Sequence, residues 1–249
     1  MRRVLRPHRA EERARMNLDF GRFDALTFDC YGTLVDWERG ILRALAPLFT
    51  SRGVASPGDD ALLERFGRAE SDVQAGPFLS YREVLRRVAR RLSEEAGFRV
   101  SEEETSVFAA SVGAWPLFAD TVGALRAFAA RFRLAVVSNV DDDLFAETAA
   151  CLGVTFETVV TAQQVRSYKP APAHFHEVLR RLALPRERVL HVAQSLHHDI
   201  APARALGFAC VWVNRRAGRA GSGATPPARA TPDLEVSDLV TLARLAGGS

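Results

Sequence analysis

The sequence predicts an α/β protein with a doubly wound, mostly parallel sheet, a Rossmann-like core that carries an inserted helical cap domain. Three observations support this prediction. Short apolar runs alternate with helical patterns, polar residues follow the ends of these runs, and one long stretch near the N-terminus holds helical patterns only. Such alternation is typical of parallel sheets made from βαβ units. With 249 residues, 47% of them hydrophobic, the chain can bury a core of this kind.

The beginning of the chain differs from the rest in charge. The first sixteen residues hold six arginines and two glutamates, a formal charge of +4, whereas the whole chain carries +3 and the remainder therefore −1. We interpret residues 1–22 as a basic N-terminal extension, in which Met16 is a candidate natural start. Because no basic stripe remains in the rest of the chain, nucleic acid is not an expected partner.

Membrane and secretory features are absent from the sequence. No apolar run approaches the ~20 residues that span a bilayer, and the N-terminus lacks the apolar segment of a secretory signal. The cysteines, Cys30, Cys151 and Cys210, are odd in number and far apart, as expected for a reduced protein rather than a disulfide scaffold. We therefore expect a cytoplasmic protein without a membrane partner. A homodimer is possible, although no surface patch in the sequence argues for it.

Strands and helices can be placed in order along the chain. Apolar runs predict strands at 25–28, 134–137, 189–192 and 209–213, with a weaker one at 158–161. Asp120 is a candidate N-cap for a helix over 122–131, and a helical stretch over 199–206 ends at Gly207, a suitable C′ residue. Residues 218–232, rich in Gly, Pro and small residues, predict a surface loop.

The stretch between Asp36 and Trp115 contains no strand-like run. Its clearest pattern is an apolar stripe with arginines on the other faces, which predicts an amphipathic helix; the stripe consists of Val84, Leu85, Val88 and Leu92. We expect residues 38–115 to form a separate helical cap domain, while residues 23–37 and 116–249 form the core domain.

Polar residues follow each predicted strand, and in an open parallel sheet ligands bind beyond the carboxyl ends of the strands. Lys169 among them is the only lysine in a chain with 33 Lys and Arg residues. Lysine presents a compact point charge, whereas arginine presents a planar fork that engages both oxygens of a carboxylate. These residues are Asp29, then Ser138 and Asn139, then Lys169, then Gln194 and Ser195, with Asp199 opening the next helix.

Taken together, these positions resemble the four ordered motifs of the haloacid dehalogenase-like hydrolase superfamily. The motifs are Asp29-Cys-Tyr-Gly-Thr-Leu34, Ser138-Asn139, Lys169-Pro170, and Ser195 with Asp199, and the resemblance covers nearly all of residues 23–245. Most members are Mg²⁺-dependent phosphatases with a second aspartate two residues after the nucleophile. Here that position is Tyr31, and the expected Gly-Asp of the fourth motif is Ala193-Gln194. The sequence is in these respects similar to the metal-free L-2-haloacid dehalogenases, so no cofactor and no metal is expected.

The resemblance implies a reaction and a role for each residue. Asp29 would displace halide from a small 2-halocarboxylate and form an ester that water then hydrolyses. Lys169 would keep the pKa of Asp29 low. The remaining implied roles are Asp199 for holding Lys169 and polarising water, Thr33, Ser138 and Ser195 for orienting carboxylates, Tyr31 for the pocket wall, and Asn139 with Arg68 (preferred over Arg65) for binding substrate and halide.

One departure from the dehalogenase pattern concerns the hydrolytic water. Leu196 stands where these dehalogenases have an asparagine, and Gln194 or His198 is a candidate replacement. His197 and His198 are neighbours on a helix and do not share a face, which argues against a zinc site. Two alternatives stay open on the sequence alone. They are a phosphatase of the same superfamily with a reduced Mg²⁺ site, and a catalytically weak member that acts as a binding protein.

Overall fold

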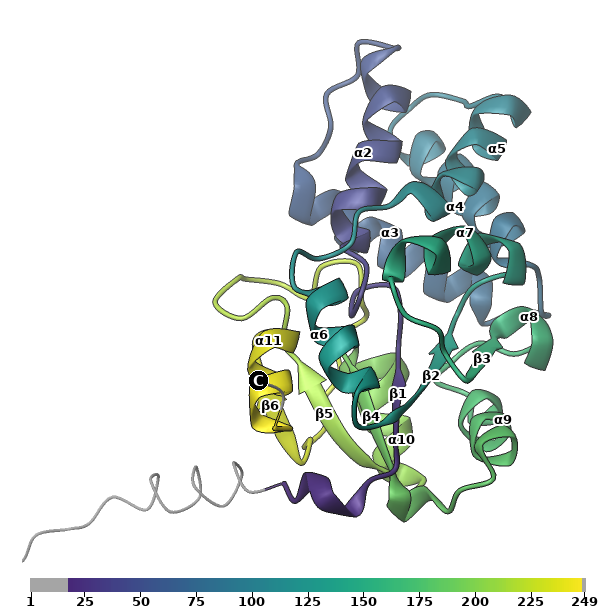
Figure 1. The fold of residues 1–249 in the computed structure, drawn as a ribbon. Helices are drawn as coiled ribbons and strands as arrows, with labels where there is room; N and C mark the ends of the chain where they lie inside the picture. The colour runs from purple at the N-terminus through teal and green to yellow at the C-terminus, as the bar shows by residue number, and fades with distance from the viewer. Residues whose placement is uncertain (1–17, 248–249) are drawn as a thin grey trace, which may run out of the picture.

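A six-stranded sheet forms the centre of the computed structural model, which describes residues 18–247 (Figure 1). The strand order is β3-β2-β1-β4-β5-β6, and every neighbouring pair is parallel. All five predicted strands are present, and the short edge strand β6 was not predicted. The strands are β1 Ala25–Phe28, β2 Arg133–Ser138, β3 Thr158–Thr161, β4 Val189–Ala193, β5 Ala209–Val213 and β6 Leu234–Val236.

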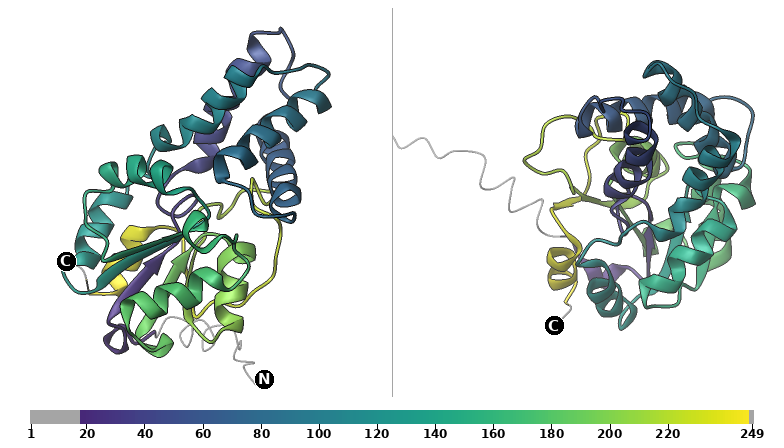
Figure 2. Two further views of the ribbon diagram at one scale, coloured as in Figure 1. Left: turned by 90° about the vertical axis from the view of Figure 1, so that its right-hand side faces the viewer. Right: turned by 90° about the horizontal axis from the view of Figure 1, so that it is seen from above.

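Helices cover both faces of the sheet, so the predicted doubly wound fold is confirmed (Figures 1 and 2). Alternation along β1 sends Leu26 and Phe28 to one apolar cluster and Ala25 to the other. The first cluster includes side chains of α6 (Thr121–Ala129), α7 (Asp142–Leu152) and α11 (Leu239–Leu245), and the second includes α9 (Ala173–Leu182) and α10 (Ala201–Ala205). Shorter helical segments are η1 Phe20–Arg22, α8 Ala162–Val165, η3 Arg186–Arg188 and the π-helix η4 Leu196–Ile200.

The strand order reverses at β1, which lies between β2 and β4. The chain runs from β1 through β2 to β3 on one side and then returns to the other side of β1 with β4. The carboxyl ends of β1, β2 and β4 are therefore neighbours at the switch point, where open α/β sheets bind ligands.

Helices also form the insertion between β1 and α6, which we call the helical insertion (residues 37–114). It lies above the carboxyl ends of the strands in Figure 1. The predicted apolar stripe of α4 is buried, as are most apolar residues of the neighbouring helices. The elements are α2 Trp37–Thr50, α3 Asp59–Gln74, α4 Tyr81–Glu95, α5 Glu102–Ala110 and the 3₁₀ turn η2 Ser111–Ala114.

Two local predictions need correction. Asp120 stands at the N-cap position of α6, as expected, but its side chain makes no capping hydrogen bond; the carboxylate instead binds Arg215 and accepts the backbone N–H of Leu239. The 218–232 segment is not simply a surface loop. It crosses to the helical insertion, where Ala224 is fully buried, and Thr225 is 7% exposed. Long-range ion pairing and packing decide both outcomes, and neither is visible in a local pattern.

The predicted N-terminal extension falls largely outside the described residues, because these begin at residue 18. Folded structure starts earlier than the predicted Phe23, since Phe20 in η1 is buried with the core. Among the helices of residues 18–247, none has both the length and the apolar character needed to cross a membrane.

Candidate active site

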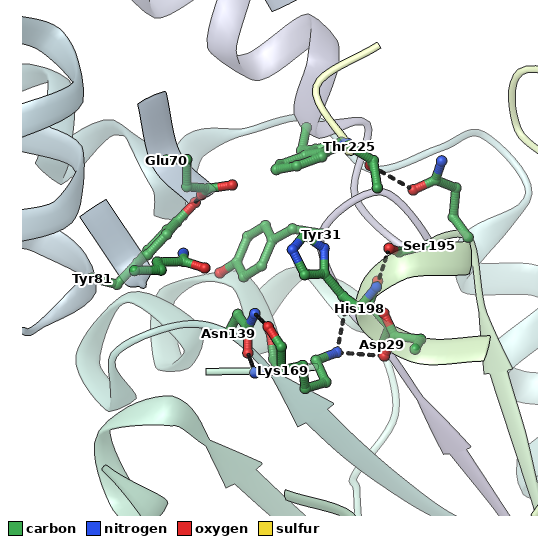
Figure 3. A pocket seen from close by; sticks show the side chains of 14 residues that line it. Asp29, Tyr31, Glu70, Tyr81, Asn139, Lys169, Ser195, His198 and Thr225 are labelled. Atoms are coloured by element: carbon green, nitrogen blue, oxygen red, sulfur yellow. Dashed lines mark hydrogen bonds and ion pairs between the residues drawn. The ribbon is translucent and has the colours of Figure 1, made fainter. Parts of the chain in front are cut away.

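Asp29 lies directly after β1 and is held by its two carboxylate oxygens (Figure 3). Oδ2 accepts a hydrogen bond from the Thr33 hydroxyl at 2.7 Å, and Oδ1 lies 2.9 Å from the Lys169 ammonium. The Thr33 hydroxyl in turn accepts the backbone N–H of Gln194 at 2.9 Å. The predicted orienting role of Thr33 therefore has a direct geometric basis.

Lys169 is buried beneath the same edge, with 1% of its surface exposed. Its Nζ donates to Asp29 Oδ1 at 2.9 Å, to Asp199 Oδ1 at 2.6 Å and to the Val137 carbonyl at 2.9 Å. These three bonds satisfy all three N–H donors of an ammonium group. A guanidinium would have to place a larger, planar group in the same buried space, which gives a structural reason for lysine at this position.

The electrostatics of this trio depend on burial as well as on charge. Burial raises the pKa of the Asp29 carboxyl above its usual value, the Lys169 ammonium opposes that rise, and the Asp199 charge adds to it. Lys169 thus acts in the expected direction, but burial outweighs it, so the expectation of a lowered pKa needs correction. Burial alone would lower the pKa of Lys169, yet the carboxylates of Asp199 and Asp29 raise it. Lys169 is therefore charged at neutral pH.

Asp199 has a second partner that the sequence did not suggest. His191 Nε2 lies 3.2 Å from Asp199 Oδ1, and His191 Nδ1 lies 3.0 Å from the Thr27 hydroxyl. Burial acts to raise the pKa of Asp199, but the Lys169 ammonium and the His191 hydrogen bond hold it well below its ordinary value. In the sequence, the one sign of this contact was His191 itself, a polar residue within the apolar run of β4.

Asn139 lines the pocket, and its amide also holds the backbone of Lys169. Its Oδ1 accepts the backbone N–H of Lys169 at 2.8 Å, and its Nδ2 donates to the Lys169 carbonyl at 3.1 Å. The carbonyl oxygen and one N–H of the amide thus hold the lysine backbone, and the second N–H of Nδ2 is not used in these two bonds. Ser138 is fully buried and lines the pocket, and its hydroxyl has no hydrogen-bond partner within residues 18–247.

The fourth motif forms the start of the π-helix η4. The Ser195 hydroxyl accepts the backbone N–H of His198 at 2.8 Å, so Ser195 caps this helix, and it also lines the pocket. Gln194 and His198 both line the pocket, whereas Leu196 packs against the apolar cluster of α9 and α10. Burial lowers the pKa of His198 to about 3, which leaves a neutral imidazole at the site.

Residues from the helical insertion and the 218–232 segment complete the pocket, and none of them was predicted. Glu70 and Tyr81 face the Asp29 side from the insertion (Figure 3). Tyr31 forms part of the wall, as expected, and its hydroxyl is 2.9 Å from that of Thr148. The cavity volume is about 30 Å³. The other lining residues that the sequence did not indicate are Trp37, Gln74 and Thr225.

The predicted halide-binding arginine does not line this pocket. Arg68 is exposed and lines a separate groove with Ser222 and Pro226, and Arg65 does not line the pocket either. The helix phase explains the error, because the face of α3 that points to Asp29 carries Glu70. In the stretch LLERFGRAES, the side chain that lines the pocket is therefore the acidic Glu70 and not one of the two arginines.

The donor set at this edge is poorly suited to Mg²⁺. Magnesium prefers oxygen ligands that usually include carboxylates, but Asp29 and Asp199 are both already bonded to Lys169. Position 31 is tyrosine and position 194 is an amide. Within residues 18–247, no group of three or more His, Cys, Asp or Glu side chains is arranged to hold a metal ion.

Comparison with known proteins gives a consistent family. A family model described as haloacid dehalogenase-like hydrolase matches residues 23–207. Haloacid dehalogenase-like hydrolase domain-containing protein 3 of Danio rerio is 31% identical over 123 residues, which cover 49% of this chain. The matched region spans only about half (51%) of that relative's length.

Longer matches include proteins with two different activities. Haloacetate dehalogenase H-2 of Moraxella sp. (strain B) is 25% identical over 78% of this chain and 87% of its own length. Phosphoglycolate phosphatase of Salmonella typhi is 27% identical over 76% of this chain and 80% of its own. A solved L-2-haloacid dehalogenase superposes with a TM-score of 0.76 at 25% identity, over 91% of this chain and all (100%) of the other.

Proposed function

Since the chain belongs to the haloacid dehalogenase-like hydrolase family, we propose that it is a hydrolytic dehalogenase of small 2-haloalkanoic acids that works through an ester on Asp29 and without a metal. The observation that carries this proposal is the environment of Asp29. Thr33 and Lys169 hold its two oxygens in a small pocket, and the residue two positions on is a tyrosine instead of an acid.

The first step is displacement at carbon. The Asp29 carboxylate attacks C2 of the substrate in line, the new C–O bond forms as the carbon–halogen bond breaks, and halide leaves with the bonding electron pair. Thr33 and Lys169 orient the nucleophile, and closure of the helical insertion as a cap keeps water away from it. In-line attack inverts the configuration at C2.

The second step returns the enzyme to its starting state. Water adds to the side-chain carbonyl carbon of the Asp29 ester, the bond between that carbon and the ester oxygen breaks, and a 2-hydroxy acid departs. The oxygen of the water stays on Asp29, one of its two protons goes to the new hydroxyl group and the other is released, so the sum is haloacid plus water giving hydroxy acid, halide and a proton. Asp199, ion-paired with Lys169, and the neutral His198 are the polar groups available to orient this water.

A phosphatase is the second candidate, because a phosphoglycolate phosphatase is among the relatives. That chemistry needs a general acid to protonate the leaving group and, in most members, Mg²⁺. The hydroxyl of Tyr31 stands at the usual acid position, and burial raises its pKa well above the ordinary tyrosine value. The donor set described above also suits Mg²⁺ poorly. Both facts favour the dehalogenase.

A halide-release assay separates these functions. The protein is incubated with chloroacetate, fluoroacetate and each enantiomer of 2-chloropropionate in the presence of EDTA, with Asp29→Asn as the control. Halide release that survives chelation and is lost in the variant is the expected result. Turnover of phosphate esters only, and only with Mg²⁺, would contradict the proposal, and no turnover of either class would favour a binding protein.

Isotope labelling tests the ester directly. After single-turnover reaction with excess enzyme in H₂¹⁸O, mass spectrometry of the peptide that contains Asp29 should show one incorporated ¹⁸O. Label found only in the hydroxy acid would mean that water attacks the substrate directly, which would contradict the nucleophilic role of Asp29.

A further inference from the structure

A carboxyl group from the helical insertion faces the nucleophile across the pocket. Glu70, near the end of α3, is 4% exposed and lines the same pocket as Asp29 (Figure 3). Its Oε1 accepts a hydrogen bond from the Tyr81 hydroxyl at 2.8 Å. No other hydrogen bond or ion pair to the Glu70 side chain is formed by residues 18–247, so its second oxygen is available to a ligand.

The other pocket-lining residues supply no free positive charge. Lys169 is the only Lys or Arg among them, and it is already bonded to two carboxylates. With Glu70 ionised, the formal charge of the pocket is −2, from three carboxylates and one ammonium. An anionic substrate would bring a further negative charge into this small cavity. A neutral Glu70 would remove one negative charge and supply an O–H donor.

The pocket contains a second donor without a partner. The Ser138 hydroxyl is fully buried, lines the pocket and is unbonded within the described part of the chain. A buried hydroxyl without a partner costs free energy unless a ligand or water satisfies it. Ser138 is the last residue of β2 and Glu70 belongs to the insertion, so they approach the cavity from the core and from the insertion respectively.

We propose that protonated Glu70 binds the substrate carboxylate by donating its O–H, while Tyr81 holds the other Glu70 oxygen and the Ser138 hydroxyl donates from the core. Glu70 thus lies on the stretch of α3 where an arginine was predicted to bind halide, but its ligand is the carboxylate of the substrate. This inference rests on the proposed function, because it assumes that the substrate is a small carboxylate.

The protonation state of Glu70 is accessible near neutral pH. Burial raises the pKa of Glu70 to about 7, although the Tyr81 hydrogen bond acts to lower it. An anionic ligand in contact with the group favours the protonated form further. Substrate binding should therefore be accompanied by proton uptake above pH 7.

Apart from Asp29, the titratable groups that face Glu70 keep one charge state over the same range. Burial raises the pKa of Tyr81 and Tyr31 well above the ordinary tyrosine value, and lowers that of His198 to about 3. Lys169 stays charged, and Asp199 stays ionised. Asp29 is the exception, because burial raises its pKa. The pocket-lining residues contributed by α2 and by the 218–232 segment, Trp37 and Thr225, do not titrate.

Direct binding tests the inference without relying on catalysis. Calorimetry follows the binding of propionate, which has no leaving group, to the wild-type protein from pH 6 to 9 in buffers of different ionisation enthalpy. The apparent affinity is proportional to the protonated fraction of Glu70, so we expect it to fall by up to about tenfold per pH unit above pH 7, with proton uptake. Propionamide, the neutral analogue, should show neither effect.

Two variants make the assignment specific. Glu70→Gln keeps an N–H donor that does not titrate, so propionate should bind with an affinity that no longer falls above pH 7. Tyr81→Phe removes a hydrogen bond that lowers the pKa of Glu70, so the decrease in propionate affinity should begin at a higher pH. Circular dichroism and thermal unfolding check that both variants are folded.

The possible results separate this inference from the proposed function. Propionate affinity that is constant from pH 6 to 9 in the wild type, or a wild-type fall retained in Glu70→Gln, would overturn the role of Glu70 even if halide release is observed. The expected propionate behaviour without halide release from any haloacid would overturn the dehalogenase proposal and leave carboxylate binding by Glu70 supported.

Discussion

The carboxylate of Asp141 accepts a hydrogen bond from the backbone N–H of Tyr81, at 2.8 Å, across sixty positions of sequence. Its other oxygen accepts the N–H of Arg82 at 3.0 Å. Asp141 belongs to the core and these amides begin α4, so a buried carboxylate of the core caps a helix of the insertion. The same contact fixes Tyr81, whose hydroxyl reaches Glu70.

Replacing Asp141 by Asn should loosen this link. The variant loses the negative charge at a helix N-terminus, so we expect the free energy of unfolding to fall by about 0.5–2 kcal/mol. The KM for haloacid should also rise, because Tyr81 and Glu70 are less well positioned. Asp143→Asn is the control, since its ion pair with Arg82 is largely exposed and should matter little. Equal effects of both variants in denaturant unfolding would contradict this account.

Lys169→Arg should reduce halide release by at least about 100-fold, the usual effect of removing one group that stabilises charge in an active site. The larger guanidinium cannot reproduce three short bonds in a buried space. Arg180→Lys, at a side chain with 71% exposure, keeps the same net charge and should leave kcat/KM unchanged. Near-normal activity of Lys169→Arg would show that the shape of the cation is unimportant.

The pH dependence of activity should show an acid limb that belongs to Asp29. The nucleophile must be ionised and burial raises its pKa, so activity is lost as pH falls through that raised value. The Thr33 hydroxyl lowers the pKa of Asp29. Thr33→Val should therefore move the acid limb upward, by about half to one pH unit for one hydrogen bond.

The control for that experiment is Thr33→Ser, which keeps the hydroxyl and should keep the wild-type limb. The measurement is kcat/KM for chloroacetate as a function of pH. A limb that stays in place in Thr33→Val would mean that a group other than Asp29 produces it.

The 218–232 segment should be sensitive to the size of residue 67. A Cβ atom at Gly67 would lie 2.3 Å from the Ala224 carbonyl oxygen, so Gly67→Ala must displace the segment that carries Thr225 into the pocket. We expect a loss of about 1–3 kcal/mol in unfolding free energy and a higher KM. In Gly123→Ala the new Cβ meets nothing within 4 Å, and helix propensity should make that variant slightly more stable. Thermal unfolding of the two variants measures this difference. Wild-type stability of Gly67→Ala would contradict the close contact between residue 67 and Ala224.

Local patterns were sufficient for the elements and for the core of the site. The apolar runs identified five strands because a buried strand needs a continuous apolar sequence whatever its neighbours are. Asp29, Thr33 and Lys169 could be placed because each follows a predicted strand, and the ends of parallel strands share an edge. The contacts that local patterns do not show involve partners distant in sequence. Asn139 binds the Lys169 backbone, and the side chain of Asp120 binds Arg215 although Asp120 stands at the N-cap position of α6.

The sequence by itself determined the α/β fold, the inserted helices and the carboxylate–lysine–carboxylate trio, because strand ends and their order along the chain place these groups. Only the tertiary structure decided which face of the insertion meets the nucleophile. Helix phase and the packing of α3 against α4 turn Glu70 inward and leave Arg68 exposed. A difference of two residues along a helix changes the face by more than half a turn, and so exchanges an arginine for a carboxyl group in the pocket.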